Sequence, residues 1–190
     1  YQNPYLGGDL KGFDLKNIIE NKINESDLKN ITIDKYNNED LVKVVAKNIY
    51  DNDVVGWYQN RMEWGPRALG NRSILANPSN PKMKDIINLK IKRREKFRPF
   101  APSVLREHVS KWFKLDIDVP YMGIVLEIND SKKDLLPAVA HIDGTGRLQT
   151  VDKEKNSLFY DLIKSFYDIS GVPIVLNTSF NENEPIVNTP

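Results

Sequence analysis

Apolar residues recur at helical spacing in four stretches of the chain. These stretches lie at residues 14–24, 41–49, 83–91 and 158–166. Asp14 is placed to cap the first of them, and the Asp51-Asn52 turn is placed to end the second. A fifth, shorter apolar set predicts a helix at 107–113. The first two helices carry no residues that suggest chemistry, and we expect them to be structural.

Short runs rich in β-branched and aromatic residues alternate with these helices and predict strands. The runs lie at residues 54–58, 73–76, 100–105, 121–126 and 171–176. The run 121–126 has the most strand-like composition of the five. Strands that alternate with amphipathic helices predict an α/β domain.

The length of 190 residues suits one domain with an additional arm. Pro4 and the Gly7-Gly8 pair punctuate the start, so we expect residues 1–38 to form a linker and a helical arm, and residues 39–190 to form the domain. No apolar run approaches the roughly 20 residues that span a bilayer. The lack of cysteine excludes disulfides and thiolate metal sites. These features favour a cytoplasmic protein with no membrane partner.

Positive charge is concentrated in one part of the chain. Residues 61–98 hold eleven cations and three acids, a net charge of +8, whereas the whole chain carries +1 and the remainder therefore −7. Such a concentration predicts a site for a polyanion, most simply a phosphate or a nucleotide. The alternative is a solvated helix face, which applies to four of these cations, Lys82, Lys84, Arg93 and Lys96.

Three other cations in this window fit a solvated face less well. Arg67 follows a Gly-Pro turn, and Arg98 lies between Phe97 and Pro99-Phe100, where apolar neighbours predict burial. A buried guanidinium needs an anion or acceptors to offset its desolvation. Lys92 follows Asn88 by one helical turn, so both side chains are expected on the same side of that helix.

Two further segments are candidates for anion binding. Asn177-Thr178-Ser179 directly follows a predicted strand, where its side chains would either bind phosphate oxygens or cap the next turn, and the residues alone favour the cap. The segment 143–147, DGTGR, combines glycines with Arg147, whose planar fork suits phosphate. No Walker P-loop is present, so any ATP site must have another design.

The two histidines do not predict a metal centre. His108 and His141 are far apart in sequence and lack ligand spacing, so we expect no metal ligands on this chain. His141 lies two residues from Asp143, and we interpret this pair as structural in preference to a general base.

Four long segments make the sequence similar to a known family. They are NRMEWGPRALGNRSI at 60–74, KRREKFRPFAPS at 92–103, AHIDGTGRLQTV at 140–151 and GVPIVLNTSFNENEPIV at 171–187. Together they resemble the C-terminal domain of the NodU-type O-carbamoyltransferases, over roughly residues 40–190. The resemblance implies a YrdC-like α/β domain, with a twisted, mostly mixed sheet flanked by helices and a concave cationic face.

The resemblance also implies a function. Such a domain takes carbamoyl phosphate and ATP, with magnesium accompanying the ATP, converts the former to carbamate and adenylates it to carbamoyl-adenylate with release of pyrophosphate. An N-terminal transferase domain of the full-length protein, which carries the family's metal site, then transfers the carbamoyl group to a hydroxyl acceptor. Site residues carried over from the family are Lys92, Arg147 and Ser179 as catalytic groups, with Arg67, Arg98 and Asn177 as further ligands.

Two alternatives stay open on the sequence. A related enzyme class makes threonylcarbamoyl-adenylate and would require threonine and bicarbonate. A concave basic surface can also bind double-stranded RNA through its phosphates, although nucleic acid is not the partner that we expect. The quoted segments match the carbamoyltransferases better than either alternative.

Overall fold

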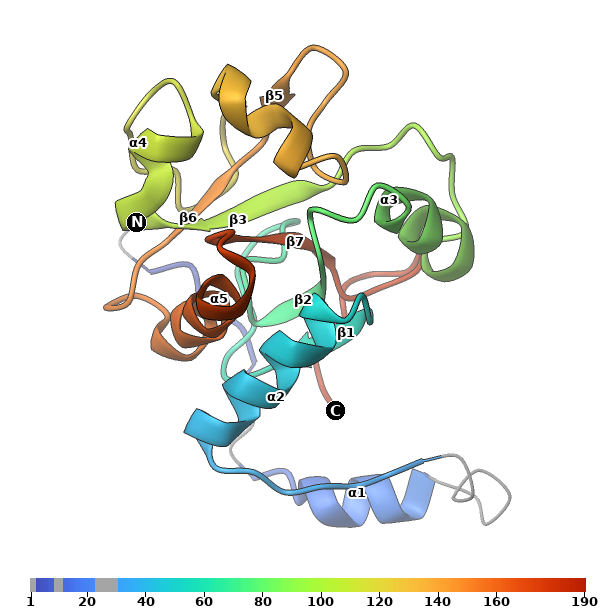
Figure 1. The fold of residues 1–190 in the computed structure, drawn as a ribbon. Helices are drawn as coiled ribbons and strands as arrows, with labels where there is room; N and C mark the ends of the chain where they lie inside the picture. Colours follow the sequence, from blue (N-terminus) through green and yellow to red (C-terminus); the bar gives the residue numbers. More distant parts are fainter. Residues whose placement is uncertain (1–2, 9–11, 23–30) are drawn as a thin grey trace.

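A five-stranded mixed sheet forms the centre of the computed structural model, which describes residues 3–8, 12–22 and 31–190 (Figure 1). The strand order is β1-β2-β7-β3-β6. The strands are β1 (Val55–Tyr58), β2 (Arg72–Ala76), β3 (Ala101–Leu105), β6 (Gln149–Val151) and β7 (Ile174–Ser179). Only the β3–β6 pair is parallel among these strands, and the other three pairings are antiparallel. The mixed α/β fold predicted from the sequence is therefore confirmed.

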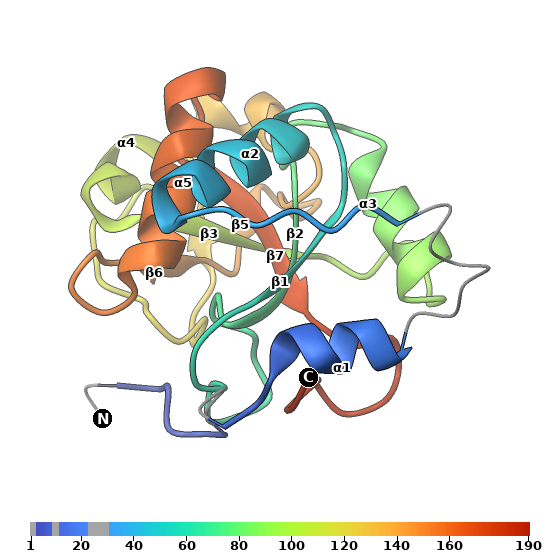
Figure 2. The same ribbon diagram turned by 90° about the horizontal axis from the view of Figure 1, so that it is seen from below.

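Two helices, α2 (Asn38–Tyr50) and α5 (Ser157–Ser170), lie side by side over one face of this sheet (Figures 1 and 2). Each begins at an asparagine whose side chain accepts a hydrogen bond from a backbone N–H of the first turn, Asn37 from Asp40 and Asn156 from Phe159. Their apolar faces are buried, as the helical spacing of the sequence predicts.

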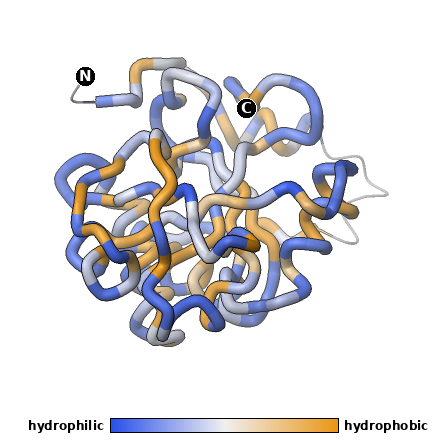
Figure 3. Tube along the Cα trace, turned by 90° about the horizontal axis from the view of Figure 1, so that it is seen from above, coloured by the Kyte–Doolittle hydropathy of each residue, from blue (hydrophilic) through white to orange (hydrophobic). Residues whose placement is uncertain are grey.

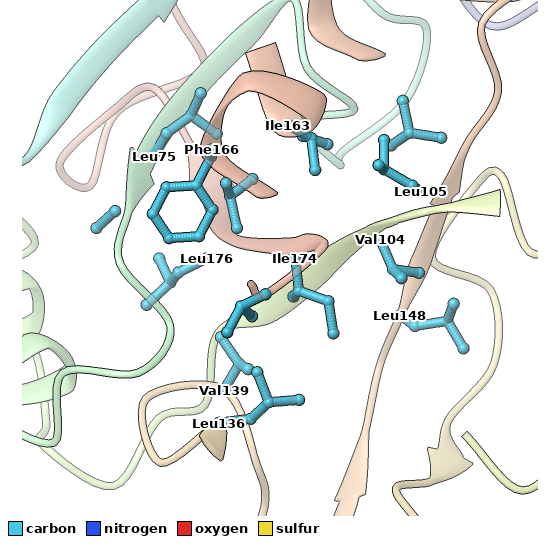
Figure 4. Packing of buried hydrophobic residues seen from close by; sticks show 14 of the residues in the cluster. Leu75, Val104, Leu105, Leu136, Val139, Leu148, Ile163, Phe166, Ile174 and Leu176 are labelled. Atoms are coloured by element: carbon cyan, nitrogen blue, oxygen red, sulfur yellow. The ribbon is translucent and has the colours of Figure 1, made fainter. Parts of the chain in front are cut away.

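The hydrophobic core fills the space between these helices and the sheet and continues beyond the strands. Figure 4 shows Phe166 of α5 between the strand residues Leu75 and Leu176, and Val139 beside Leu136. Hydrophobic segments run through the middle of the trace, and hydrophilic loops surround them (Figure 3). Burial of this core fixes the strand ends that carry the candidate site.

Short elements surround the sheet. The predicted helix at 83–91 is present, but only α3 (Met83–Ile86) is α-helical, and η2 (Ile87–Ile91) continues it as a wider π-turn. The predicted helix at 107–113 is a 3-10 turn, η3 (Arg106–His108), followed by α4 (Val109–Trp112). A second 3-10 segment, η4 (Asp130–Leu135), lies near a two-stranded sheet of β4 (Leu126–Glu127) and β5 (Thr145–Gly146).

The predicted strand at 121–126 is wrong, because only Leu126 of that run enters a strand. Met122 adopts a φ of 54°, which interrupts extended backbone and turns its side chain into a small cluster with Leu69 and Ala101. Ile124 and Val125 are about half exposed. Residues of strand-like composition form a strand where their side chains can pack on a half-buried surface. Most of the run 121–126 has no such surface to pack on.

Residues 3–8, which we call the N-terminal strap, pack against residues 61–64. The Gly7 amide donates to the Met62 carbonyl at 2.9 Å, and the Met62 amide donates to the Gly8 carbonyl at 3.0 Å. The Arg61 guanidinium also donates to the carbonyls of Leu6 and Gly7. The start of the predicted linker is thus attached to the domain, whereas the domain boundary at residue 38 stays a prediction.

The predicted first helix is present as α1 (Leu15–Lys22), set apart from the sheet in Figures 1 and 2. The last two positions of that prediction, 23 and 24, lie outside the described residues. Within residues 3–8, 12–22 and 31–190, no helix has the length and hydrophobicity that crossing a membrane requires.

Candidate anion-binding site

A small cavity of about 90 Å³ opens at one end of the sheet, where β7 ends and where β2, β3 and β6 begin. Three arginines line it, Arg67, Arg94 and Arg147, together with the polar residues Asn177, Thr178 and Ser179. Of the described residues that line the cavity, none is a carboxylate. The cavity is therefore a strongly positive environment.

Arg67 lies in the loop before β2, which one buried carboxylate holds closed. Oε1 of Glu63 accepts hydrogen bonds from the backbone amides of Leu69 at 2.7 Å, Asn71 at 2.6 Å and Arg72 at 3.2 Å. Glu63 is buried, and charge-assisted bonds of this kind are roughly twice as strong as neutral ones. Glu63 thereby fixes the path of the loop from which the exposed Arg67 side chain extends.

Asn177 forms a buried junction beside the cavity. Its Nδ2 donates to the Ala68 carbonyl at 3.2 Å, to Ser103 Oγ at 3.0 Å and to Gln149 Oε1 at 3.2 Å. These three acceptors assign the orientation of the amide. Its Oδ1 is buried and has no hydrogen-bond partner among the described residues, so one acceptor of this amide is left unsatisfied.

Arg147 and Arg94 are both partly buried at the cavity. Burial lowers the pKa of Arg147, and the neighbouring Arg67 acts in the same direction. Nε of Arg147 is buried without a partner among the described residues. The pKa of Arg94 is lowered by burial and then by Arg98, while its Nε donates to Asn88 Oδ1 at 2.7 Å and its guanidinium lies over the Phe100 ring. Arginine keeps its charge in proteins, so this cluster favours an anion between the three guanidinium groups.

Lys92 lies at the end of η2, and its ammonium reaches the end of β7. The ammonium donates to the Ser179 and Asn181 carbonyls and to Asn181 Oδ1, and Ser179 Oγ lies 3.4 Å away. Asn88, which we expected on the same side of the helix, is buried as Lys92 is. Lys92 thus contacts Ser179, but Lys92 itself is absent from the described lining of the cavity.

The predicted burial of Arg98 is wrong. Its side chain is 52% exposed and pairs with Glu95 at 2.9 Å, one turn earlier in the same surface loop. Phe97 is 73% exposed, so the apolar neighbours of Arg98 do not enclose it. The loop takes this course because Asn88 Nδ2 donates to the Lys96 and Arg98 carbonyls and holds the backbone, leaving the side chains outward.

Most cations of the positive window have other partners. Arg72 is fully buried among the carbonyls of Gln59, Asn60 and Asn71 and stacks on the Tyr58 ring. Arg93 lies 3.6 Å from Glu182, and Lys96 lies 4.0 Å from Asp85. Only Arg67 and Arg94 of this window line the cavity among the described residues, and Arg147 joins them from outside it.

The turn at 143–147 contributes only its arginine to the described lining. Asp143 Oδ1 accepts from the Thr145 amide at 3.0 Å and from Thr145 Oγ1 at 2.7 Å, and His141 Nδ1 lies 3.0 Å from the same hydroxyl. His141 and Asp143 are thus linked through Thr145. In the part of the chain that the structure describes, no three His, Cys, Asp or Glu side chains gather where an ion could be held.

The sequence pattern does not single out Arg94, Thr178 or Glu63 for the site. Arg94 belongs to the positive window, and its place two residues after Lys92 gives no signal that it faces the cavity. Thr178 belongs to the polar strand end that was recognised. A lone acid at position 63 among three arginines is the available signal for Glu63.

An arginine-lined cavity at the strand ends of a mixed sheet makes this an α/β domain with a candidate anion site. Residues 46–190 match the carbamoyltransferase C-terminus family, so the chain belongs to that family. It is 51% identical over 148 residues to the nodulation protein NolNO of Sinorhizobium fredii, a match that covers 76% of this chain and 22% of that protein. It is 39% identical over 137 residues to nodulation protein U of Rhizobium tropici, covering 72% and 24%. The resemblance to NodU-type carbamoyltransferases is thus confirmed.

The chain spans about a quarter of the length of these curated relatives. A solved structure of full-length HypF in its phosphate- and nucleotide-bound form shares the fold, with a TM-score of 0.55 and 17% identity. That match covers 82% of this chain and 19% of HypF, and it agrees with the YrdC-like fold predicted from the sequence.

Proposed function

We propose that this domain activates a carbamoyl group with ATP, as the first half of an O-carbamoyl transfer. Carbamoyl phosphate is hydrolysed to carbamate and phosphate. A carbamate oxygen then attacks the α-phosphorus of ATP, the bond to the β-phosphate oxygen breaks, and carbamoyl-adenylate and pyrophosphate are the products. Positioned cations supply most of the stabilisation in phosphoryl chemistry of this kind, and the cavity is lined by three arginines.

The observation that carries the proposal is the pair of unsatisfied polar atoms at the cavity. Within the described residues, Arg147 Nε is a buried donor and Asn177 Oδ1 a buried acceptor, each without a partner. A carbamoyl group attached to a phosphate offers both an oxygen acceptor and an N–H donor, so it carries a partner for each of these two kinds of atom. A simple anion would leave the Asn177 oxygen unsatisfied, at a cost of roughly 1–3 kcal/mol.

The remaining residues take supporting roles in this proposal. Arg67 and Arg94 would hold phosphate oxygens, Ser179 would donate from the strand end, and Lys92 would fix Ser179 in place. Magnesium would arrive on the phosphates of ATP, because the described lining has no carboxylate to bind it. Transfer to a hydroxyl would take place on an N-terminal transferase domain of the full-length protein, in the cytoplasm.

Pyrophosphate release from ATP tests the proposal. The chain should release pyrophosphate only when carbamoyl phosphate is present, and Arg147→Met should reduce the rate by about 100-fold or more, since removing one donor to a developing charge costs this much in other enzymes. Arg106→Met is the matched control, because Arg106 is a cation that pairs with Asp116 outside the cavity. No acceptor should become carbamoylated.

Three results would count against the proposal. Release that depends on threonine and bicarbonate would favour threonylcarbamoyl-adenylate synthesis. Binding of double-stranded RNA that weakens steeply with salt, without response to carbamoyl phosphate, would favour an RNA-binding module. An inactive chain that also binds neither ATP nor carbamoyl phosphate in calorimetry would remove the site assignment.

A further inference from the structure

A second, larger cavity adjoins the anion cavity. It measures about 420 Å³, a size within the usual range of ligand pockets, and is mainly apolar. Leu6 of the N-terminal strap, Trp64, Leu69 and Tyr121 line it. Pro66 and Arg67 line both cavities, so the two spaces meet at this corner of the loop before β2.

The sizes of the two cavities indicate which part of a nucleotide each of them could hold. The anion cavity, at about 90 Å³, is much smaller than its neighbour of about 420 Å³ and is lined by arginines and polar side chains, so it suits phosphate or carbamoyl groups better than a base. We therefore look for the base outside it. The neighbouring apolar cavity has the volume and the lining that a flat aromatic ring needs.

Trp64 is the most exposed tryptophan of the chain. Its side chain is 77% exposed, whereas Trp57 and Trp112 are buried. Its backbone is nevertheless fixed, because its amide donates to the Pro4 carbonyl at 2.7 Å and the preceding Glu63 is buried. A large aromatic ring held by a rigid backbone beside an apolar cavity offers a surface for stacking.

We propose that the apolar cavity binds the base of a nucleotide whose phosphates occupy the anion cavity, with the base against Trp64 and with Arg67 at the junction. This inference rests on the proposed function, which supplies the nucleotide. Stacking on an aromatic ring accepts any base, so Trp64 contributes affinity for the base and little choice between bases.

A comparison of ATP with inorganic triphosphate, both with magnesium, separates the two cavities. Triphosphate carries the charge without the base, so it should bind through the arginines alone. Acrylamide quenching of tryptophan fluorescence reports mainly on Trp64, since the other two tryptophans are buried. ATP should protect Trp64 from acrylamide, and triphosphate should not.

Trp64→Ala should weaken ATP binding by about 5-fold to 150-fold in calorimetry, the range for loss of one stacked base, and should leave triphosphate binding within twofold. Phe97→Ala is the control, because Phe97 is almost as exposed and does not line the described apolar cavity. Unchanged ATP affinity in Trp64→Ala, with no protection of Trp64, would overturn this inference and leave the proposed function standing. Failure of the unmodified chain to bind either anion would overturn both.

Discussion

Lys92 places a charge where water hardly reaches. Its side chain is almost completely buried, and its ammonium has acceptors from Ser179 and Asn181. Burial lowers its pKa to about 8, the nearby Arg94 also lowers it, and Glu184 partly opposes them. The strand end that carries Ser179 is therefore held by a group that titrates close to physiological pH.

The lowered pKa of Lys92 predicts how stability changes with pH. Between pH 8 and the ordinary lysine value of 10.5, the unfolded chain binds this proton and the folded chain does not, so the free energy of unfolding gains from this residue as pH rises. Lys92→Met should lack that gain. Urea unfolding of both proteins from pH 7 to 10 measures it, with the exposed Lys96→Met as control. Parallel curves for Lys92→Met and the unmodified chain would contradict the prediction.

Within the loop before β2, two glycines share one backbone conformation in different surroundings. Gly65 and Gly70 both have a φ of 104°, in the region that side chains disfavour. A Cβ on Gly70 would lie 2.2 Å from Cδ1 of Phe159, which is buried in α5, whereas a Cβ on Gly65 would meet no described atom within 4 Å. The loop that presents Arg67 thus rests directly on the helix behind the sheet.

This difference makes a paired prediction. Gly65→Ala should cost only the backbone strain of about 1–2 kcal/mol. Gly70→Ala should cost about 2–5 kcal/mol, because overpacking against Phe159 adds to the same strain. The free energy of unfolding from urea titration tests the pair. Equal losses in the two variants would show that the loop moves away from α5 freely.

Periodicity predicted the elements wherever the side chains pack on the core. The spacing of Leu158, Leu162 and Phe166 is the buried stripe of α5, and the run before Asn177 is β7. Residues 121–126 have the composition of a strand, but only Met122 and Leu126 of this run are buried, so composition misled. The short β6 was not predicted, because its parallel partner β3 lies 46 residues earlier and no local pattern reports such a pairing.

The candidate site was predictable only in part, for a related reason. Arg67, Arg147 and the pair Asn177 and Ser179 come from three separate segments, and the structure brings them to one cavity. Arg94 and Arg98 lie four residues apart in one basic run, and the hydrogen bonds of Asn88 decide which of them faces the cavity. Such a choice depends on the folded path of the loop, which the sequence pattern does not contain.

On the scale of the whole molecule, the N-terminal strap connects distant parts of the chain. The Tyr5 hydroxyl donates to the Leu69 carbonyl and accepts from Asn156 Nδ2, 151 residues away. Burial raises the pKa of Tyr5 well above its usual value, so this hydroxyl stays neutral. The strap also supplies one wall of the apolar cavity.

The attachment of the strap depends on Arg61, whose guanidinium lies 2.8 Å from the Leu6 carbonyl and 3.0 Å from that of Gly7. We expect Arg61→Met to speed hydrogen exchange at the Gly7 and Met62 amides on the order of tenfold, since each such bond contributes about 1 kcal/mol. Exchange measured by NMR tests this, with Arg106→Met as a matched surface control. Unchanged exchange at both amides would show that the backbone pairing alone holds the strap.

The order in which the strands are made has a consequence for how the protein is completed. β7 is the last strand of the described chain and lies in the middle of the sheet, between β2 and β3. During synthesis on the ribosome, β2 and β3 are made before β7, so the edges that later pair with β7 have no partner. Such unpaired edges are prone to associate with other chains. The same strand brings Asn177 and Ser179 to the cavity. A nascent chain therefore joins the two halves of its sheet and assembles the candidate site in one step, and a truncated product ending before residue 174 would lack both.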